Sequence, residues 1–130
     1  MILAAVIVGS ALGGMARFWL ADAVSRRLGE RLPWGTLAVN TSGALAIGVL
    51  AALMTGAPGG GAMGTAWHFA VLGFLGSYTT VSSFSLQTLA LLHDRAWRRA
   101  AANIVLSLGL CLSAAGTGLL AGGWLARSLA

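Results

Sequence analysis

The chain has 130 residues, of which 58% are hydrophobic and only 8% are charged, a composition outside the range of soluble globular domains. The formal net charge of +5 comes from arginines spread over several short segments, and no basic surface gathers that would suit a nucleic acid. An integral membrane protein without a soluble catalytic domain is the class that remains.

Four apolar segments are long enough to cross a bilayer, since a spanning helix needs about 20 mostly apolar residues. They cover approximately residues 2–21, 35–55, 67–92 and 100–123. The longest polar connection between them runs from Asp22 to Pro33. The sequence therefore predicts a single all-helical domain over residues 1–130, in a multi-pass protein surrounded by the lipid of the cell (inner) membrane.

The first span contains Arg17, a costly residue at membrane depth. Close to the loop end of the helix, its charged end can extend to the lipid headgroups. Alternatively, it attracts anions to a vestibule. The same arginine interrupts the apolar run before Ala21, so we expect no signal-peptide cleavage at that point.

The second span carries Asn40 shortly after the segment Pro33-Trp34-Gly35-Thr36. A side-chain amide inside a membrane needs a partner, so Asn40 is either a hydrogen-bond clamp between helices or a donor that faces a pore. The run from Gly56 to Gly64, which contains Pro58, predicts a flexible turn before the third span.

The stretch GSYTTVSSFS, residues 76–85, places seven hydroxyl side chains near the middle of the third span. Gly76 and the β-branched pair Thr79-Thr80 weaken the helix there, and hydroxyl groups can take over the freed backbone hydrogen bonds. A mid-membrane break is tolerated where it is buried in protein or lines a cavity, and its carbonyl groups can coordinate a cation. The alternative is that these hydroxyls bond to their own continuous helix.

The fourth span has a polar stripe, because Gly109, Ser113 and Thr117 share one face at four-residue spacing. Such a stripe either holds helices together or lines a path. Cys111, the one cysteine of the chain, lies in the same span. We expect it to be a buried, inert thiol.

Small residues recur at four-residue spacing in three spans, which lets helix backbones approach closely. They are Gly9 and Gly13, then Ala44, Gly48 and Ala52, then Ala114, Gly118 and Gly122. Packing within one chain explains any single face as well as contact with another subunit does. Four short helices can hardly enclose a pore alone, however, so these faces together favour a dimer.

Most arginines fall in the two connections on one side of the predicted membrane. They are Arg26, Arg27 and Arg31 between the first two spans, and Arg95, Arg98 and Arg99 between the last two. The opposite side has only Arg127. The positive-inside rule therefore places both termini outside the cytoplasm.

Acidic residues are absent from the interior of all four expected spans, since Asp22, Glu30 and Asp94 lie in or beside loops. A proton-coupled cation exporter normally needs a carboxylate within the membrane, so that class is poorly supported. The sequence shows neither a nucleophile with a base and an orienting group nor a cluster of metal ligands. We therefore do not expect an enzyme.

Three segments together resemble the small four-helix fluoride channels usually called Fluc or CrcB. They are GSALGGMARFWL, PWGTLAVNTSG and GFLGSYTTVSSFSLQT, and their order on the first three spans makes the resemblance specific over nearly the whole chain. It implies a third helix broken in mid-membrane and an antiparallel dimer of the dual-topology type with two narrow pores. Such a dimer exports toxic fluoride passively and gives fluoride resistance.

The resemblance also implies roles for individual residues. A structural sodium ion would lie at the centre of the dimer, held by the backbone carbonyls of Gly76 and Thr79 from each subunit. Asn40 would be a donor facing fluoride, and the positive ring edge of Phe84 would face the dehydrated anion. The further candidates are Ser83, Ser113 and Thr36 in a polar track, and Arg17 near an aqueous vestibule.

Two features depart from the family pattern. The family usually reads TTFSTF where this chain reads TTVSSF, so Val81 replaces one of two aromatic stations of the fluoride path. The arginine bias favours one orientation, whereas a chain that inserts both ways should have little bias. Two interpretations are open: a fluoride channel made of two copies, or a conduction-poor subunit that completes a heterodimer with a homologous partner chain.

Overall fold

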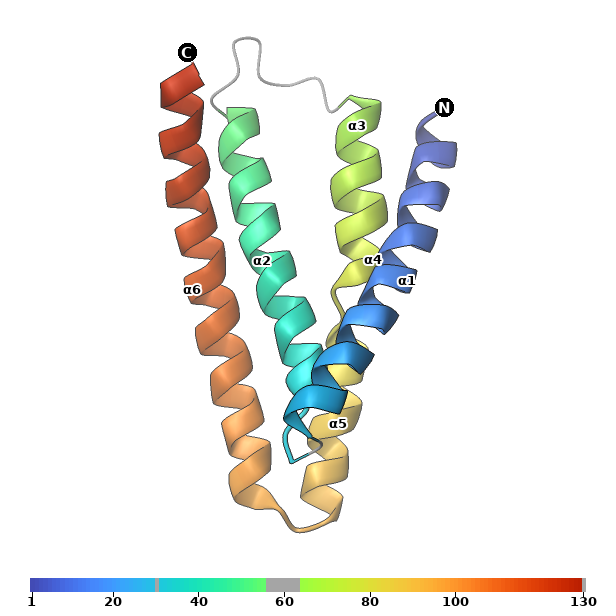
Figure 1. Cartoon of the computed structure of the whole chain (residues 1–130), viewed down its shortest axis with the longest axis vertical. Helices are drawn as coiled ribbons and strands as arrows, with labels where there is room; N and C mark the ends of the chain where they lie inside the picture. The colour runs from blue at the N-terminus through green and yellow to red at the C-terminus, as the bar shows by residue number, and fades with distance from the viewer. Residues whose placement is uncertain (30, 56–63, 130) are drawn as a thin grey trace.

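The computed structural model describes residues 1–29, 31–55 and 64–129, and within these ranges the regular structure is helical throughout (Figure 1). The elements are α1 (Ile2–Leu28), α2 (Trp34–Thr55), α3 (Thr65–Trp67), η1 (His68–Leu75), α4 (Gly76–Tyr78), α5 (Val81–His93) and α6 (Trp97–Leu129). The flexible turn predicted from Gly56 to Gly64 falls almost entirely outside the described residues.

Four helical segments are long and apolar enough to cross a membrane. They are Ile2–Leu28, Trp34–Met54, Thr65–His93 and Trp97–Ser128. Large apolar side chains on their outer faces are exposed, among them Phe18 at 77% and Trp19 at 71%, as expected for helices that face lipid. The prediction of four transmembrane segments in a multi-pass membrane protein is confirmed.

The first helix is longer than predicted. α1 continues to Leu28, so the polar connection expected from Asp22 to Pro33 is too long. Arg26 and Arg27 therefore lie in the last turn of α1 instead of in a loop. Arg26 forms an ion pair with Asp22 one turn earlier, and cationic side chains at this end complement the helix dipole, which explains the extension.

The last helix likewise begins earlier than predicted, at Trp97, so Arg98 and Arg99 occupy its first turn and not a loop. The corner between α5 and α6 consists of residues 94–96 alone. Arg95 has a φ of 56° there, the left-handed conformation that permits so tight a turn. Arginine has a good intrinsic helix propensity, so the helix resumes at once.

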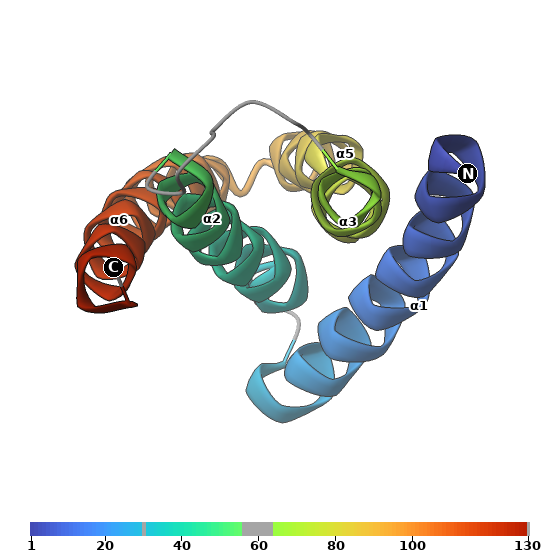
Figure 2. The ribbon, with the colours of Figure 1, turned by 90° about the horizontal axis from the view of Figure 1, so that it is seen from above.

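Two pairs of helices pack with their backbones in close approach. A Cβ atom on Gly13 of α1 would come within 2.2 Å of the Phe74 carbonyl oxygen in η1, and one on Gly118 of α6 would come within 2.4 Å of the Leu45 carbonyl oxygen in α2. Figure 1 shows α2 beside α6, and the view from above shows α6 and α1 at opposite ends of the molecule (Figure 2). These small-residue faces are used inside one chain, so they give no argument for a dimer.

The third span changes its backbone geometry along its length. His68–Leu75 forms a π-helix, a rare and wider turn that the sequence did not lead us to expect. After the single turn of α4, Thr79 (φ −77°, ψ 158°) and Thr80 (φ −152°, ψ 125°) are extended, and α5 starts at Val81. The helical path is therefore interrupted at the two threonines.

A small core lies directly beside this interruption. It consists of Val39, Leu75 and Tyr78, and the rings of Phe74 and Tyr78 stack with their centroids 5.7 Å apart. The Tyr78 hydroxyl shares a hydrogen bond of 2.8 Å with Ser42 of α2. This core joins α2 to the last turn before the interruption and so positions the two extended threonines.

Candidate functional site

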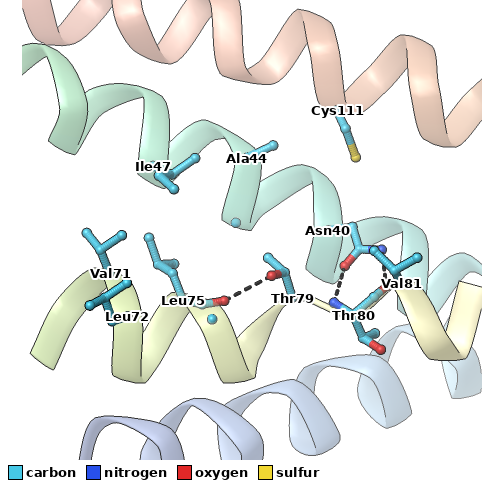
Figure 3. Close-up of a pocket in the computed structure, with 12 residues that line it drawn as sticks. Asn40, Ala44, Ile47, Val71, Leu72, Leu75, Thr79, Thr80, Val81 and Cys111 are labelled. Carbon is cyan, nitrogen blue, oxygen red and sulfur yellow. Dashed lines mark hydrogen bonds between the residues drawn. The ribbon is translucent and has the colours of Figure 1, made fainter. Parts of the chain in front are cut away.

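The interruption is held from α2 by the side-chain amide of Asn40 (Figure 3). Asn40 Nδ2 donates to the Thr80 carbonyl oxygen at 2.8 Å, and the Thr80 N–H donates to Asn40 Oδ1, also at 2.8 Å. Because Thr80 is extended, it lies outside the helical hydrogen-bond ladder, and unsatisfied backbone groups in an apolar setting are costly. Asn40 is thus a clamp between helices, one of the two roles considered for it.

The backbone groups of Thr80 also determine which way the Asn40 amide points. A backbone N–H can only donate and a carbonyl can only accept, so the amide nitrogen must face the Thr80 carbonyl oxygen. A primary amide has a second N–H, and the two bonds to Thr80 do not use it. Asn40 can therefore act as a clamp and as a donor at the same time.

Hydroxyl groups satisfy further backbone groups around the interruption. The Thr80 hydroxyl accepts from the Ser83 N–H at 3.2 Å, and this bond caps the first turn of α5. The Thr79 hydroxyl donates to the Leu75 carbonyl oxygen at 3.0 Å. Further along α5, the Ser85 hydroxyl bonds to its own helix at the Val81 carbonyl. Both interpretations of the hydroxyl-rich stretch therefore apply, each to a different part of it.

Gly76 and Thr79 lose the hydrogen-bond donors that a continuous α-helix would give their carbonyl groups. In an α-helix, the N–H of each residue donates to the carbonyl four positions earlier. The Thr80 N–H goes to Asn40 instead of Gly76. The Ser83 N–H goes to the Thr80 hydroxyl instead of the Thr79 carbonyl. Carbonyl oxygens of this kind are suited to a monovalent cation.

An open cavity of about 610 Å³ lies between α2 and the third span (Figure 3). Its lining includes Asn40, Gly76, Thr79, Thr80, Val81 and Cys111. Val81 is 76% exposed at its edge. Cys111 is half-buried, with its Sγ 4.0 Å from the Thr41 Oγ1, so the prediction of a buried thiol is wrong. Cys111 is therefore one of the residues that line the cavity.

The other predicted path residues are not part of the cavity lining. Ser83 and Phe84 are half-buried in the first turn of α5, Thr36 is buried in the first turn of α2, and Arg17 is half-buried in α1. Arg17 was expected close to the loop end of its helix. Since α1 continues to Leu28, Arg17 lies about 16 Å before that end at 1.5 Å per residue.

The polar stripe of α6 faces away from the cavity. Gly109, Ser113 and Thr117 are all exposed, whereas the buried positions of α6 face the other helices. The Thr117 hydroxyl donates to the carbonyl oxygens of Ser113 and Ala114 in its own helix. Within the described part of one chain, the structure therefore does not bring Ser113 together with Asn40.

Three polar residues near the site were not singled out from the sequence. Asn103 of α6 is 3% exposed and donates from Nδ2 to Thr88 Oγ1 at 2.8 Å. Gln87 precedes that threonine, and its Oε1 is the one buried side-chain oxygen or nitrogen without a partner among the described residues. Asn103 carried the same signal as Asn40, an amide near the start of a predicted span, and could have been found from it.

The chain matches the family model described as CrcB-like protein, Camphor Resistance (CrcB), over residues 4–119. It is 52% identical over 116 residues to the Fluoride-specific ion channel FluC 2 of Bradyrhizobium diazoefficiens, covering 89% of this chain and 85% of that protein. It is 55% identical over 113 residues to FluC 2 of Rhodopseudomonas palustris, covering 87% and 86%. It is 50% identical over 115 residues to FluC 4 of Brucella abortus, covering 87% and 85%.

Proposed function

The chain belongs to the CrcB-like family, and from that premise we propose that it forms a fluoride-selective channel through which toxic fluoride leaves the cell down its gradient. The curated relatives named above are ion channels and not enzymes. The observation that carries the proposal is the Asn40 amide, which is held by Thr80 and has one N–H left without a partner among the described residues.

Fluoride must lose water to enter a narrow path, so the path has to supply hydrogen-bond donors and positive partial charge instead. The second N–H of Asn40 supplies a donor that needs no rearrangement. The edge of the Phe84 ring carries partial positive charge. The hydroxyls of Ser83 and Thr36 add polar groups on the same two helices, and Arg17 attracts anions toward the entrance.

The conducting unit in this proposal is an antiparallel dimer. The cavity beside Asn40 is open along one side, and Ser113 lies on an exposed face of α6. Lipid offers no polar partner to the exposed Ser113 hydroxyl, so a second copy is the neighbour that would use it. In a dimer, Ser113 of one copy would then join a path whose aromatic group comes from the other.

A structural sodium ion at the dimer centre belongs to the same proposal. The chemistry of the donor set fits, because the carbonyl oxygens of Gly76 and Thr79 lack their usual helical donors and are hard oxygen ligands of the type that monovalent cations take in membrane proteins. Four such oxygens from two copies would hold the ion and link the subunits. The break would then lie in mid-membrane.

A second candidate function is a conduction-poor subunit that needs a homologous partner chain. The arginines favour it: Arg26 and Arg27 end α1, and Arg98 and Arg99 begin α6, at the same end of the molecule (Figure 1). Such a bias favours one orientation in the membrane. An antiparallel pair would then need a different chain inserted the other way.

Fluoride efflux from liposomes that hold only this purified chain tests both candidates. The channel proposal expects rapid fluoride efflux and no chloride efflux under the same conditions. Absence of fluoride efflux from a chain that elutes as an intact dimer would contradict the proposal and favour the partner subunit. Protein-free liposomes and liposomes with the Phe84→Ile variant serve as controls.

A further inference from the structure

Phe84 lies between two threonines, each one helical turn away, and each of these threonines is held by an asparagine from another helix. Thr80 is bound by Asn40 of α2. Thr88 accepts a hydrogen bond from Asn103 of α6 at 2.8 Å. The half-helix that carries the aromatic ring is thus fixed one turn before the ring and one turn after it.

The Asn103 bond is buried and has a defined direction. Asn103 is 3% exposed and Thr88 is 8% exposed. A hydroxyl has one proton to donate, and the Thr88 hydroxyl donates it to the Phe84 carbonyl oxygen at 2.7 Å. The amide must therefore be the donor in its bond to Thr88. The resulting chain of bonds runs from α6 to the backbone of Phe84 itself.

No other side-chain hydrogen bond joins α5 to α6 among the residues that the structure describes. The two helices meet at the corner of residues 94–96 and separate with distance from it (Figure 1). Thr88 and Asn103 lie roughly 8–9 Å from that corner at 1.5 Å per residue. The bond therefore sets how far α5 stands from α6 at Thr88, one turn from Phe84.

We propose that Asn103 is a positioning residue for conduction, which acts through Thr88 to hold Phe84 in the fluoride path. This inference rests on the proposed channel function. Asn103 donates to Thr88, and its effect arises because a ring edge stabilises an anion only at the right distance and angle. Loss of the bond lets α5 move relative to α6 without unfolding either helix.

Three variants separate positioning from simple stability: Thr88→Val, Asn103→Leu and the two combined. Thr88→Val leaves the buried Asn103 amide without its acceptor, so this chain should give the least assembled dimer. The double variant replaces both partners by apolar groups of similar shape, so its assembly should recover. Its fluoride efflux should stay at least about tenfold below the parent rate, because small displacements in a preorganised site are costly. Thr88→Ser keeps the hydroxyl and should conduct like the parent.

Efflux within about twofold of the parent from an assembled double variant overturns the inference, since conduction then follows stability alone. If the double variant does not assemble, the fluoride efflux of Asn103→Leu is compared with that of Thr88→Ser. Reduced efflux in Asn103→Leu alone supports positioning, and parent-like efflux in both variants overturns the inference. If the parent itself conducts no fluoride, the proposed function fails separately. In that case the amide hydrogen exchange of residues 81–93 tests the inference. Exchange rates in Asn103→Leu equal to those of the parent overturn it.

Discussion

Replacing Asn40 by leucine tests the clamp at the interruption most directly. The change removes two hydrogen bonds of 2.8 Å and leaves the N–H and the carbonyl of Thr80 without partners. Each buried backbone group left unsatisfied costs about 1–3 kcal/mol, so the two together cost about 2–6 kcal/mol. Asn40 is only half-buried and lines an open cavity that can admit water, so we expect the lower part of this range, about 2–4 kcal/mol.

The free energy of unfolding of the purified protein in detergent measures this effect. The five tryptophans of the chain report unfolding by their fluorescence as denaturant is added, and the midpoint should fall with little change in slope. Gln87→Leu is the matched control, because it removes an amide whose Oε1 has no partner in the described part of the chain. It should change stability by less than about 1 kcal/mol.

An Asn40→Leu chain that unfolds within about 1 kcal/mol of the parent would refute the reasoning, because that is the lower limit for even one unsatisfied group. The interruption would then find other partners, and the amide would be available for the ion alone. A loss as large in Gln87→Leu as in Asn40→Leu would point to a general effect of removing an amide from these helices.

Four further predictions concern conduction and orientation. Phe84→Ile keeps bulk and apolarity but removes the positive ring edge, so fluoride efflux should fall at least about tenfold, the factor for roughly 1.4 kcal/mol. The variant should still elute as an intact dimer on size exclusion. Parent-like efflux would show that the ring is dispensable. Val81→Phe, on an exposed side chain, should leave efflux intact or raise it. Fluoride conduction should require sodium without transporting it, so the reversal potential in a fluoride gradient should not depend on the sodium gradient. A change of the reversal potential with the sodium gradient would show sodium transport. Reporter tags on the C-terminus should be active only outside the cytoplasm, whereas equal signals from both sides would indicate dual insertion.

Hydropathy alone predicted the four spans, because their length and apolar content are properties of each segment taken by itself. The extended residues Thr79 and Thr80 are the pair singled out for weak helix propensity. Their depth in a membrane is still a prediction. The end of α1 was placed too early, since the ion pair of Arg26 with Asp22 and the helix dipole stabilise its last turn. The start of α6 was placed too late, because Arg98 and Arg99 were assigned to a loop although arginine has a good helix propensity.

Relations between segments were beyond the reach of the sequence. The spacing of Gly109, Ser113 and Thr117 defined one face of a helix, but spacing does not say which neighbour that face meets, and it proved to be exposed. The same limit applies to Asn40, for which a clamp and a pore donor were equally consistent until Thr80 was seen beside it. The π-helix of η1, which packs closely against α1, has no local signal in the sequence.

The order of the Asn40 clamp along the chain matters for synthesis. The amide lies forty residues before the threonine that it satisfies. A ribosome adds about 5–20 residues per second, so Asn40 is made about 2–8 s before Thr80. The second span can therefore already present its amide when the third span leaves the translocon. The N–H and the carbonyl of Thr80 can then pair with the Asn40 amide as soon as the third span enters the bilayer. These backbone groups do not depend on a later helix for their hydrogen bonds.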